Sequence, residues 1–261
     1  MKDSIVLTRQ SHIAVLTFNR PDKLNTFDQD MTDHFEALCQ EINEDQTIRA
    51  VLLRGEGEVF SAGSDLHELY RKLDSFPAEA LSGIRQFNAC ILLLREMEKL
   101  VIASVHGMVM GIGMSLLLAA DLAIASENTK LALSYNRIAL SPAGASSYLL
   151  PRIVGTKKAL ELLVMPEMID AKEALNLGLV NWIVPHEELA SRTQLILDTI
   201  ANGPMVALVQ TKQLMNSAWQ NKLTSQLEFE AEAFVRCVNT RDFKTAVRAF
   251  VNKREPEFEG R

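Results

Sequence analysis

An uncharged stretch of 21 residues, at positions 100–120, most limits what this chain can fold into. A membrane-spanning helix needs about 20 mainly apolar residues, so the length alone would fit a membrane span. However, the stretch contains His106 and three glycines, and it changes from a β-branched start to an end rich in Leu and Ala. Short apolar runs that are bounded by glycine are typical of buried elements. We therefore expect a buried strand, a glycine-rich loop and a buried helix, with no membrane association.

Composition and charge exclude several classes of protein. The 261 residues are 48% hydrophobic and 23% charged, which is close to the globular average and excludes a disordered chain. A formal net charge of −6 argues against broad binding to nucleic acid. The three cysteines, Cys39, Cys90 and Cys237, are widely spaced, and the first residues contain no apolar run typical of a secretory signal. We expect a protein of the cytoplasm.

Strand-like and helix-like patterns alternate through the first 140 residues or so. Apolar alternation predicts a hairpin of residues 5–8 and 13–18, and helical spacing predicts a helix over 28–44. Further strands are expected at 50–53, 100–105 and 121–125, and helices at 77–99 and 113–120. Beyond Pro142 we expect helices at 156–165, 171–177, 187–201, 205–218, 223–239 and 241–253, with a single strand at 180–184. Such alternation predicts an α/β fold with parallel strands.

Common cofactor and hydrolase motifs are absent from the sequence. There is no phosphate-binding loop of the P-loop type, and the glycines at 107, 111 and 113 do not complete a dinucleotide fingerprint. His67 and His186 each begin a pattern like a zinc-binding helix, but both lack the second histidine. No Gly-x-Ser-x-Gly motif occurs. We expect neither a metal site nor NAD or ATP chemistry.

Two glycine-containing loops, at residues 59–69 and 106–113, each lie between an expected strand and an expected helix. Such loops let backbone N–H groups converge on an anion at a helix N-terminus. Two converging donors make an oxyanion hole, which stabilises the oxyanion formed from a carbonyl substrate. The alternative is that both loops are ordinary packing turns.

The two loops belong to an ordered series of motifs along nearly the whole chain. The series comprises Asn-Arg-Pro-Asp-Lys-Leu-Asn-Thr at 19–26, Phe-Ser-Ala-Gly-Ser-Asp-Leu at 60–66, Val-His-Gly at 105–107 through to Ala-Asp at 120–121, Leu-Ser-Pro at 140–142, Leu-Pro-Arg-Ile-Val-Gly at 150–155, Ala-Lys-Glu-Ala at 171–174 with Gly-Leu-Val at 178–180, and Ala-Phe-Val-Asn-Lys-Arg at 249–254. Together they resemble the enoyl-CoA hydratase/isomerase, or crotonase, superfamily, and are closer to its isomerase branch.

The resemblance implies a crotonase-like spiral of ββα units over residues 1–200 and a C-terminal helical trimerisation region over 201–261. It implies an acyl-CoA thioester as substrate, no cofactor apart from the coenzyme A of that substrate, and assembly into a trimer or hexamer. The two oxyanion N–H donors would be Ser64 and Ile112, provided that the β-branched Ile112 has a negative φ. Positions expected to bind the substrate are Lys23, Leu24, Ala62, Leu66, Gly111, Phe250 and Lys253, the last two often acting from a neighbouring subunit.

The sequence departs from the family where acid–base chemistry is expected. Hydratases of the family use two glutamates, and the matching positions hold Ser115 and Tyr135. Isomerases often carry an acidic residue after a Ser-Pro pair, and Ala143 stands there. The candidates for acid or base are therefore Asp65, His67, Glu68, Tyr135 and Ser115. For Asp65 the alternative is an ordinary helix cap, and for Ser115 a buried hydroxyl bonded to the preceding turn.

Three functions remain open at this point. The preferred one is double-bond isomerisation or hydration of an enoyl-CoA through a thioester enolate, because a chain that had lost catalysis would be expected to have lost its loops as well. The alternatives are a catalytically impaired acyl-CoA-binding paralogue and a decarboxylase of a malonyl-type thioester, which needs enolate stabilisation but less from a base.

Overall fold

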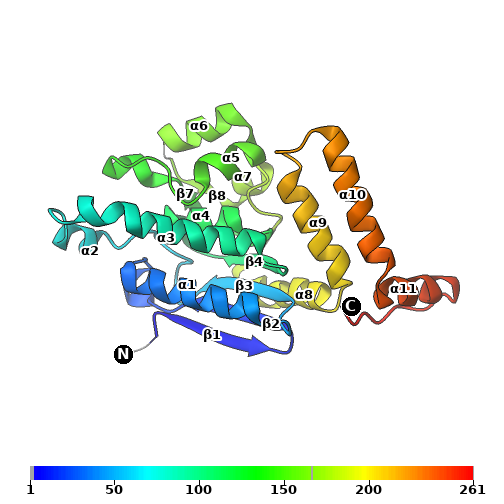
Figure 1. Cartoon of the computed structure of the whole chain (residues 1–261). Coiled ribbons are helices and arrows are strands. Elements are labelled where there is room, and N and C mark those ends of the chain that lie inside the picture. The colour runs from blue at the N-terminus through cyan, green and yellow to red at the C-terminus, as the bar shows by residue number, and fades with distance from the viewer. Residues whose placement is uncertain (1–2, 166, 261) are drawn as a thin grey trace.

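The computed structural model describes residues 3–165 and 167–260 and is built around a six-stranded sheet (Figure 1). The strand order is β1-β2-β3-β4-β6-β9, with β1 (Ile5–Gln10), β2 (Ile13–Phe18), β3 (Ala50–Gly55), β4 (Leu100–Val105), β6 (Leu122–Ser126) and β9 (Trp182–Val184). The first two strands form the expected antiparallel hairpin, and all the other neighbours are parallel. The α/β prediction is confirmed.

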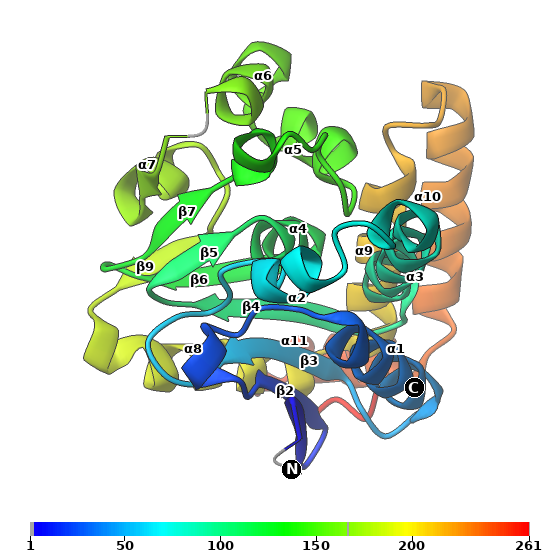
Figure 2. The same cartoon turned by 90° about the vertical axis from the view of Figure 1, so that its left-hand side faces the viewer.

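The central strands β2, β3, β4 and β6 are buried on both faces of the sheet, as their nearly continuous apolar runs indicate. On β2, Ala14, Leu16 and Phe18 join the main core, whereas Ile13 and Val15 face a second, smaller core. Helices α1 (Gln29–Glu44) and α3 (Phe76–Glu96) supply apolar residues to the main core. Helix α8 (Leu189–Ala201) covers the second core with Leu197, Ile200 and Ala201 (Figure 2).

The uncharged stretch divides into β4, β5 (Met108–Met110) and α4 (Ile112–Ala119). Within the described residues, no helix is long and apolar enough to cross a membrane. The expected strand and helix are confirmed, but the loop between them contains a short strand. Strand β5 pairs with β7 (Lys130–Ala132), which in turn pairs with β8 (Ile169–Asp170), and so a second sheet forms.

Several short elements escape the sequence analysis. The expectation of a single strand beyond Pro142 is wrong, because β8 also lies there. Strands of two or three residues are too short to show an alternating pattern. Helix α5 (Ser146–Val154) follows two residues with left-handed backbone, Gly144 with φ 58° and Ala145 with φ 62°. The remaining helices before residue 200 are α2 (Leu66–Arg71), α6 (Thr156–Val164) and α7 (Ala171–Asn176). Short 3-10 turns lie at Pro21–Lys23, Ser134–Ile138 and His186–Glu188.

Three C-terminal helices form a layer at one end of the molecule (Figure 1). These are α9 (Met205–Ser217), α10 (Leu223–Val238) and α11 (Arg241–Val251), close to their expected bounds. A buried ion pair ties α9 to the rest of the fold, with the Lys212 ammonium 2.9 Å from the Asp121 carboxylate. The same ammonium donates to the carbonyl oxygens of Leu94 at 2.9 Å and Lys99 at 2.8 Å.

Candidate active site

The two glycine-containing loops run side by side after β3 and β4. Ser61 and Val109 form a parallel bridge, and the Met110 amide donates to the Ser61 carbonyl at 2.9 Å. Further along, a Cβ built on Gly63 would lie 3.7 Å from the Gly111 Cα, so the two glycine backbones are in contact. Ser64 and Ile112 are the residues that directly follow these two glycines in the sequence.

The Ser64 N–H points away from the N-terminal segment. The Phe27 amide donates to the Gly63 carbonyl at 2.8 Å, which fixes that carbonyl toward Phe27. In a trans peptide the N–H points opposite to the carbonyl, so the Ser64 N–H is turned to the other side. Gly63 has φ +100°, a conformation that L side chains rarely adopt. Within the described part of the chain, the Ser64 N–H has no hydrogen-bond acceptor.

The Ile112 N–H is the first amide of α4. Helix α4 begins at Ile112, and the Gly111 carbonyl accepts the Ser115 amide at 3.1 Å, so the Ile112 N–H points out of the helix end. The first amides of a helix have no partner inside it. Ile112 is absent from the residues with positive φ, which meets the condition for a β-branched residue at this position. Among residues 3–165 and 167–260 this N–H also finds no acceptor.

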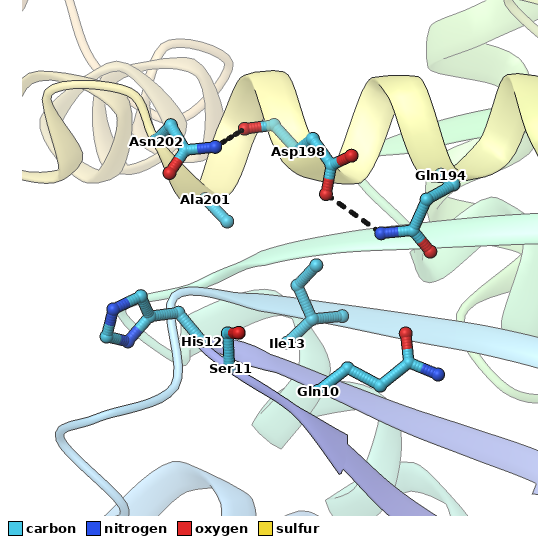
Figure 3. A pocket seen from close by; sticks show the side chains of 8 residues that line it. All are labelled: Gln10, Ser11, His12, Ile13, Gln194, Asp198, Ala201 and Asn202. Carbon is cyan, nitrogen blue, oxygen red and sulfur yellow. Dashed lines mark hydrogen bonds between the residues drawn. The ribbon is translucent and has the colours of Figure 1, made fainter.

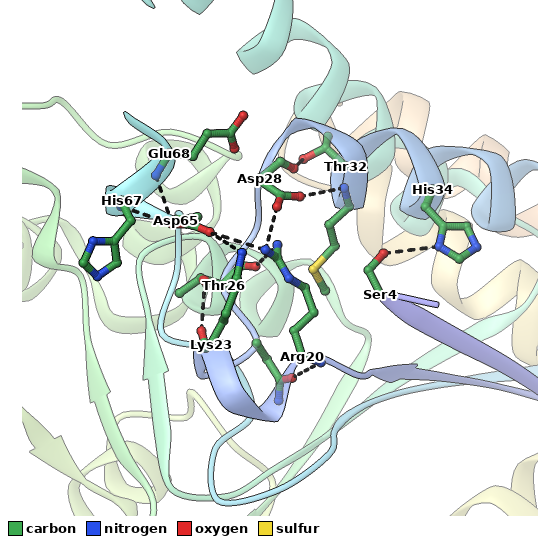
Figure 4. Close-up of polar contacts among 12 residues, drawn as sticks. Ser4, Arg20, Lys23, Thr26, Asp28, Thr32, His34, Asp65, His67 and Glu68 are labelled. Atoms are coloured by element: carbon green, nitrogen blue, oxygen red, sulfur yellow. Dashed lines mark hydrogen bonds and ion pairs between the residues drawn. The ribbon is translucent and has the colours of Figure 1, made fainter. Parts of the chain in front are cut away.

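Asp65, the first of the acid–base candidates, caps a helix and is held by cations (Figure 4). One oxygen accepts the amides of His67 and Glu68, both at 3.1 Å. The other lies 3.4 Å from the Arg20 guanidinium and 3.5 Å from the Lys23 ammonium. Burial acts to raise the pKa of Asp65, but the Glu68 amide and the Lys23 and Arg20 charges outweigh it, so the pKa lies below its ordinary value of 3.8. A lowered pKa makes this carboxylate a weaker base.

His67 and Glu68 lie on α2, beyond Asp65. His67 is exposed to solvent. The Glu68 carboxylate forms an ion pair with Lys72 at 2.9 Å, one helical turn further on. In the part of the chain that is described, neither side chain forms a hydrogen bond or an ion pair with residues 106–113.

Ser115 and Tyr135 meet in a buried cluster of hydroxyl groups. The Ser115 Oγ lies 2.8 Å from the Tyr135 hydroxyl and 3.1 Å from the Ser146 Oγ, and it donates to the Ala143 carbonyl at 3.1 Å. Burial raises the pKa of Tyr135 above its ordinary value of 10, although the bonds with Ser115 and Ser146 act in the opposite direction. The cluster lies one helical turn beyond Ile112 on α4.

Ser146 is the member of this cluster that the sequence analysis missed. It opens α5, and its side chain is completely buried. Nothing in the sequence shows that its hydroxyl meets Ser115, because the two residues are 31 positions apart. Gly144 lets this segment approach closely, because a Cβ there would lie 2.7 Å from the Ser115 Oγ.

The residues expected to bind the substrate divide into two groups. Lys23, Leu24, Ala62, Leu66 and Gly111 lie on or next to the paired loops, and the Ala62 amide donates to the Leu24 carbonyl at 3.0 Å. Phe250 and Lys253 lie on or just after α11, at the opposite end of the molecule from α2 (Figure 1). Within one chain, the structure does not bring this second group to the loops.

A small cleft lies away from these loops, between the β1–β2 turn and α8 (Figure 3). Its volume is about 160 Å³, and it is lined by Gln10, Ser11, His12, Ile13, Gln194, Asp198, Ala201 and Asn202. The cleft is at the amino end of β2, whereas the paired loops follow the carboxyl ends of β3 and β4. Neither in this cleft nor in the rest of the described residues is a group of three or more His, Cys, Asp or Glu side chains placed to hold a metal ion.

Comparison with known proteins identifies the family. A family model described as enoyl-CoA hydratase/isomerase matches residues 8–261. The chain is 31% identical to the 1,2-epoxyphenylacetyl-CoA isomerase of Escherichia coli, over 100% of both chains. It is 32% identical to the short-chain-enoyl-CoA hydratase of Clostridium acetobutylicum, over 98% of this chain and 97% of that protein. The crystal structure of an enoyl-CoA hydratase from Bacillus anthracis matches with a TM-score of 0.93 at 27% identity, covering 99% of this chain and 100% of that one. The chain is therefore an enzyme of the enoyl-CoA hydratase/isomerase family.

Proposed function

We propose that this enzyme stabilises the enolate of an acyl-CoA thioester between the N–H groups of Ser64 and Ile112. The observation that carries the proposal is that these two amides, both without an acceptor among the described residues, directly follow two glycines whose backbones are in contact, and that one of them is at the N-terminus of α4. Preorganised donors in such a site typically contribute about 100- to 1,000-fold each to the rate. The reaction is double-bond isomerisation or hydration of an enoyl-CoA, as the names of the relatives suggest.

Tyr135 is the proton donor in this proposal, supported by Ser115 and Ser146. A buried phenol with a raised pKa carries its proton at neutral pH, so it suits protonation of an enolate better than removal of a proton. Ser115 orients the phenol through the 2.8 Å hydrogen bond. Asp65 serves as a helix cap and a partner of Arg20, which leaves His67 and Glu68 as the remaining candidates for a base.

Coenzyme A binds along the first loop in this proposal, against Lys23, Leu24, Ala62 and Leu66, and no further cofactor is needed. Phe250 and Lys253 reach the nucleotide from a neighbouring copy, because their own helix lies at the other end of the molecule (Figure 1). The assembly is a trimer or hexamer, with residues 201–261 as the contact region. Exposed apolar side chains on α10 and α11 support this arrangement.

A mass-spectrometric screen of acyl-CoA thioesters tests the proposed reaction, with 2-enoyl-CoA and 3-enoyl-CoA substrates at its centre. Ser64→Pro removes one N–H, and Ile112→Pro removes the other at the first helical position, where proline is tolerated. We expect each variant to lose about 100-fold or more in turnover. Gln29→Pro, at the first position of α1, is the control and should retain activity. Turnover that is equal in wild type and both loop variants would refute the proposal.

A second candidate, decarboxylation of a malonyl-type thioester, is favoured by one observation. The hydroxyl cluster at Ser115 and Tyr135 contains no carboxylate, and decarboxylation yields the enolate without a base. Loss of the carboxylate as carbon dioxide would leave an enolate, to which Tyr135 would then donate its proton. Carbon dioxide released from methylmalonyl-CoA, without turnover of enoyl-CoA, would select this reaction. Micromolar binding of acyl-CoA in calorimetry without any turnover would instead indicate the binding-only alternative.

A further inference from the structure

Ser61 is completely buried at the point where three segments of the chain meet. Its hydroxyl donates to the Asn25 carbonyl at 2.8 Å and accepts the Gly63 amide at 3.2 Å. Its own amide donates to the Met108 carbonyl at 3.2 Å, and its carbonyl accepts the Met110 amide at 2.9 Å. One residue therefore bonds to the N-terminal segment and to both loops of the site.

The side chain of Ser61 acts on the first loop. Its bond to the Gly63 amide closes a turn that ends directly before Ser64. The other partner, Asn25, is itself rigidly held, because its side-chain amide donates to the carbonyls of Glu56 at 2.9 Å and Val59 at 2.8 Å. Asn25 is completely buried and has φ 52°, a left-handed conformation that asparagine tolerates better than most residues. Through this hydroxyl, the turn at Gly63 is therefore attached to a fixed support.

The backbone of Ser61 acts on the second loop. Met110, whose amide bonds to Ser61, stands two residues before Ile112. Gly113, in the first turn of α4, lies directly on Ser61: a Cβ on Gly113 would be 2.7 Å from the Ser61 carbonyl oxygen and 3.1 Å from its Cβ. The N-terminus of α4 therefore packs against the same residue that holds the turn before Ser64.

We propose that Ser61 is a positioning residue, which sets the placement of the Ser64 N–H relative to the Ile112 N–H. The inference rests on the proposed oxyanion hole and deepens it. Donors must lie about 2.7–3.1 Å from the developing oxyanion, and a misplacement of about 1 Å in a reacting group can cost 100-fold in rate. If the hydroxyl is removed, the backbone of residue 61 keeps its contacts to the second loop, but the turn at Gly63 loses its attachment to Asn25.

The variant Ser61→Ala tests this role, because it removes the hydroxyl and leaves the backbone bonds in place. We expect kcat for the enoyl-CoA substrate to fall about 10- to 100-fold with little change in KM, since the lost interaction acts in the transition state. Isotope-edited infrared spectra of bound butyryl-CoA give a second readout. The thioester carbonyl stretch, lowered by the two N–H donors in wild type, should move back toward its frequency in free butyryl-CoA. Ser61→Cys, which keeps a weak donor, should lie between alanine and wild type in both measurements.

Ser104→Ala is the matched control. Ser104 is also buried, and its hydroxyl forms one side-chain hydrogen bond, to Thr193 at 2.9 Å, away from both loops. This variant should keep the wild-type kcat and the wild-type carbonyl frequency. Wild-type values for Ser61→Ala, or equal losses in Ser61→Ala and Ser104→Ala, would overturn the positioning role.

The outcome for Ser61 can be separated from that for the proposed function. Normal turnover in both Ser64→Pro and Ile112→Pro would mean that the oxyanion hole itself is wrong, and the positioning role falls with it. Loss of turnover in those two variants together with normal kcat in Ser61→Ala would leave the oxyanion hole in place and overturn only the role of Ser61.

Discussion

Asp65 and Asp170 are two aspartates with the same local role in different surroundings. Each precedes a helix and accepts amides of the first turn: Asp65 those of α2, and Asp170 that of Glu173 in α7 at 2.9 Å. Asp170 is exposed, whereas only 5% of Asp65 is exposed and two cations flank it. Removal of Asp65 would therefore lower the free energy of unfolding by more than the loss of an N-cap alone.

We expect Asp170→Ala to lower the free energy of unfolding by about 1 kcal/mol, the usual cost of a lost N-cap. Asp65→Ala should cost about 3 kcal/mol, because it also leaves Arg20 and Lys23 without this partner in a partly buried site. Urea denaturation of both variants measures the difference. Equal losses would show that the charge environment of Asp65 contributes nothing.

The buried His106 makes the stability of the fold depend on pH. It is buried next to His186, with the ring centres 5.6 Å apart, and its Nε2 lies 2.9 Å from the Gly57 carbonyl. Burial lowers the pKa of His106 below its ordinary value of 6.5, and the nearby His186 acts in the same direction. Between the lowered pKa and 6.5 the unfolded chain binds more protons than the folded one, so stability decreases as the pH falls below 6.5.

The variant His106→Gln should weaken this dependence, and urea midpoints between pH 5 and 7.5 would measure it. His12→Gln, at an exposed histidine, is the control and should keep the pH dependence of the wild type. A dependence that stays unchanged in His106→Gln would assign the effect to other groups.

At the scale of elements, the regular helices and strands could be predicted because their apolar residues repeat over many positions. Helix α1 is an example because one buried face runs along it, and strands β2 and β3 are examples because each is a continuous run of buried residues. The paired loops were also located, because glycines stand between a strand and a helix. Strand β8, with two residues, has no period, and its pairing with β7 depends on tertiary structure.

Contacts between distant residues explain why the rest of the site could not be predicted. The Ser115–Ser146 and Asn25–Ser61 hydrogen bonds join residues that are 31 and 36 positions apart, and no local pattern encodes them. Leu24 and Ala145 adopt positive φ although neither residue type favours that conformation, so their own side chains give no sign of these turns.

The attachment of α9 gives a prediction at the same scale. The buried Lys212 ammonium contacts the Asp121 carboxylate and donates to two carbonyl oxygens. Lys212→Met would leave Asp121 buried with less compensation, and we expect a loss of about 3–5 kcal/mol in unfolding free energy. The double variant Lys212→Met/Asp121→Asn removes both charges and should recover part of this loss. Urea denaturation of the single and double variants tests the coupling, and strictly additive losses would contradict it.

At the scale of the whole molecule, the C-terminal helices present apolar side chains that one chain does not cover. On α10, Leu223, Leu227 and Phe234 are spaced by four and seven residues and so share one face. Their exposed fractions are 74%, 54% and 70%. Phe250 on α11 is 85% exposed. Soluble monomers rarely leave such contiguous apolar surface uncovered, which supports the proposed self-association.

We expect Leu227→Glu and Phe234→Glu to shift the protein toward the monomer, because each places a charge where an apolar side chain would be buried between copies. Full burial of one such side chain is worth about 1.5–3 kcal/mol, or roughly 10- to 150-fold in an association constant. Sedimentation velocity across a range of protein concentrations measures the shift. Leu195→Glu, at a residue of α8 that is 55% exposed, is the control and should sediment as wild type. Phe250 and Lys253 are proposed to act across the contact between copies. The monomeric variants should therefore also bind acyl-CoA more weakly. Undiminished binding by a monomer would contradict that part of the proposal.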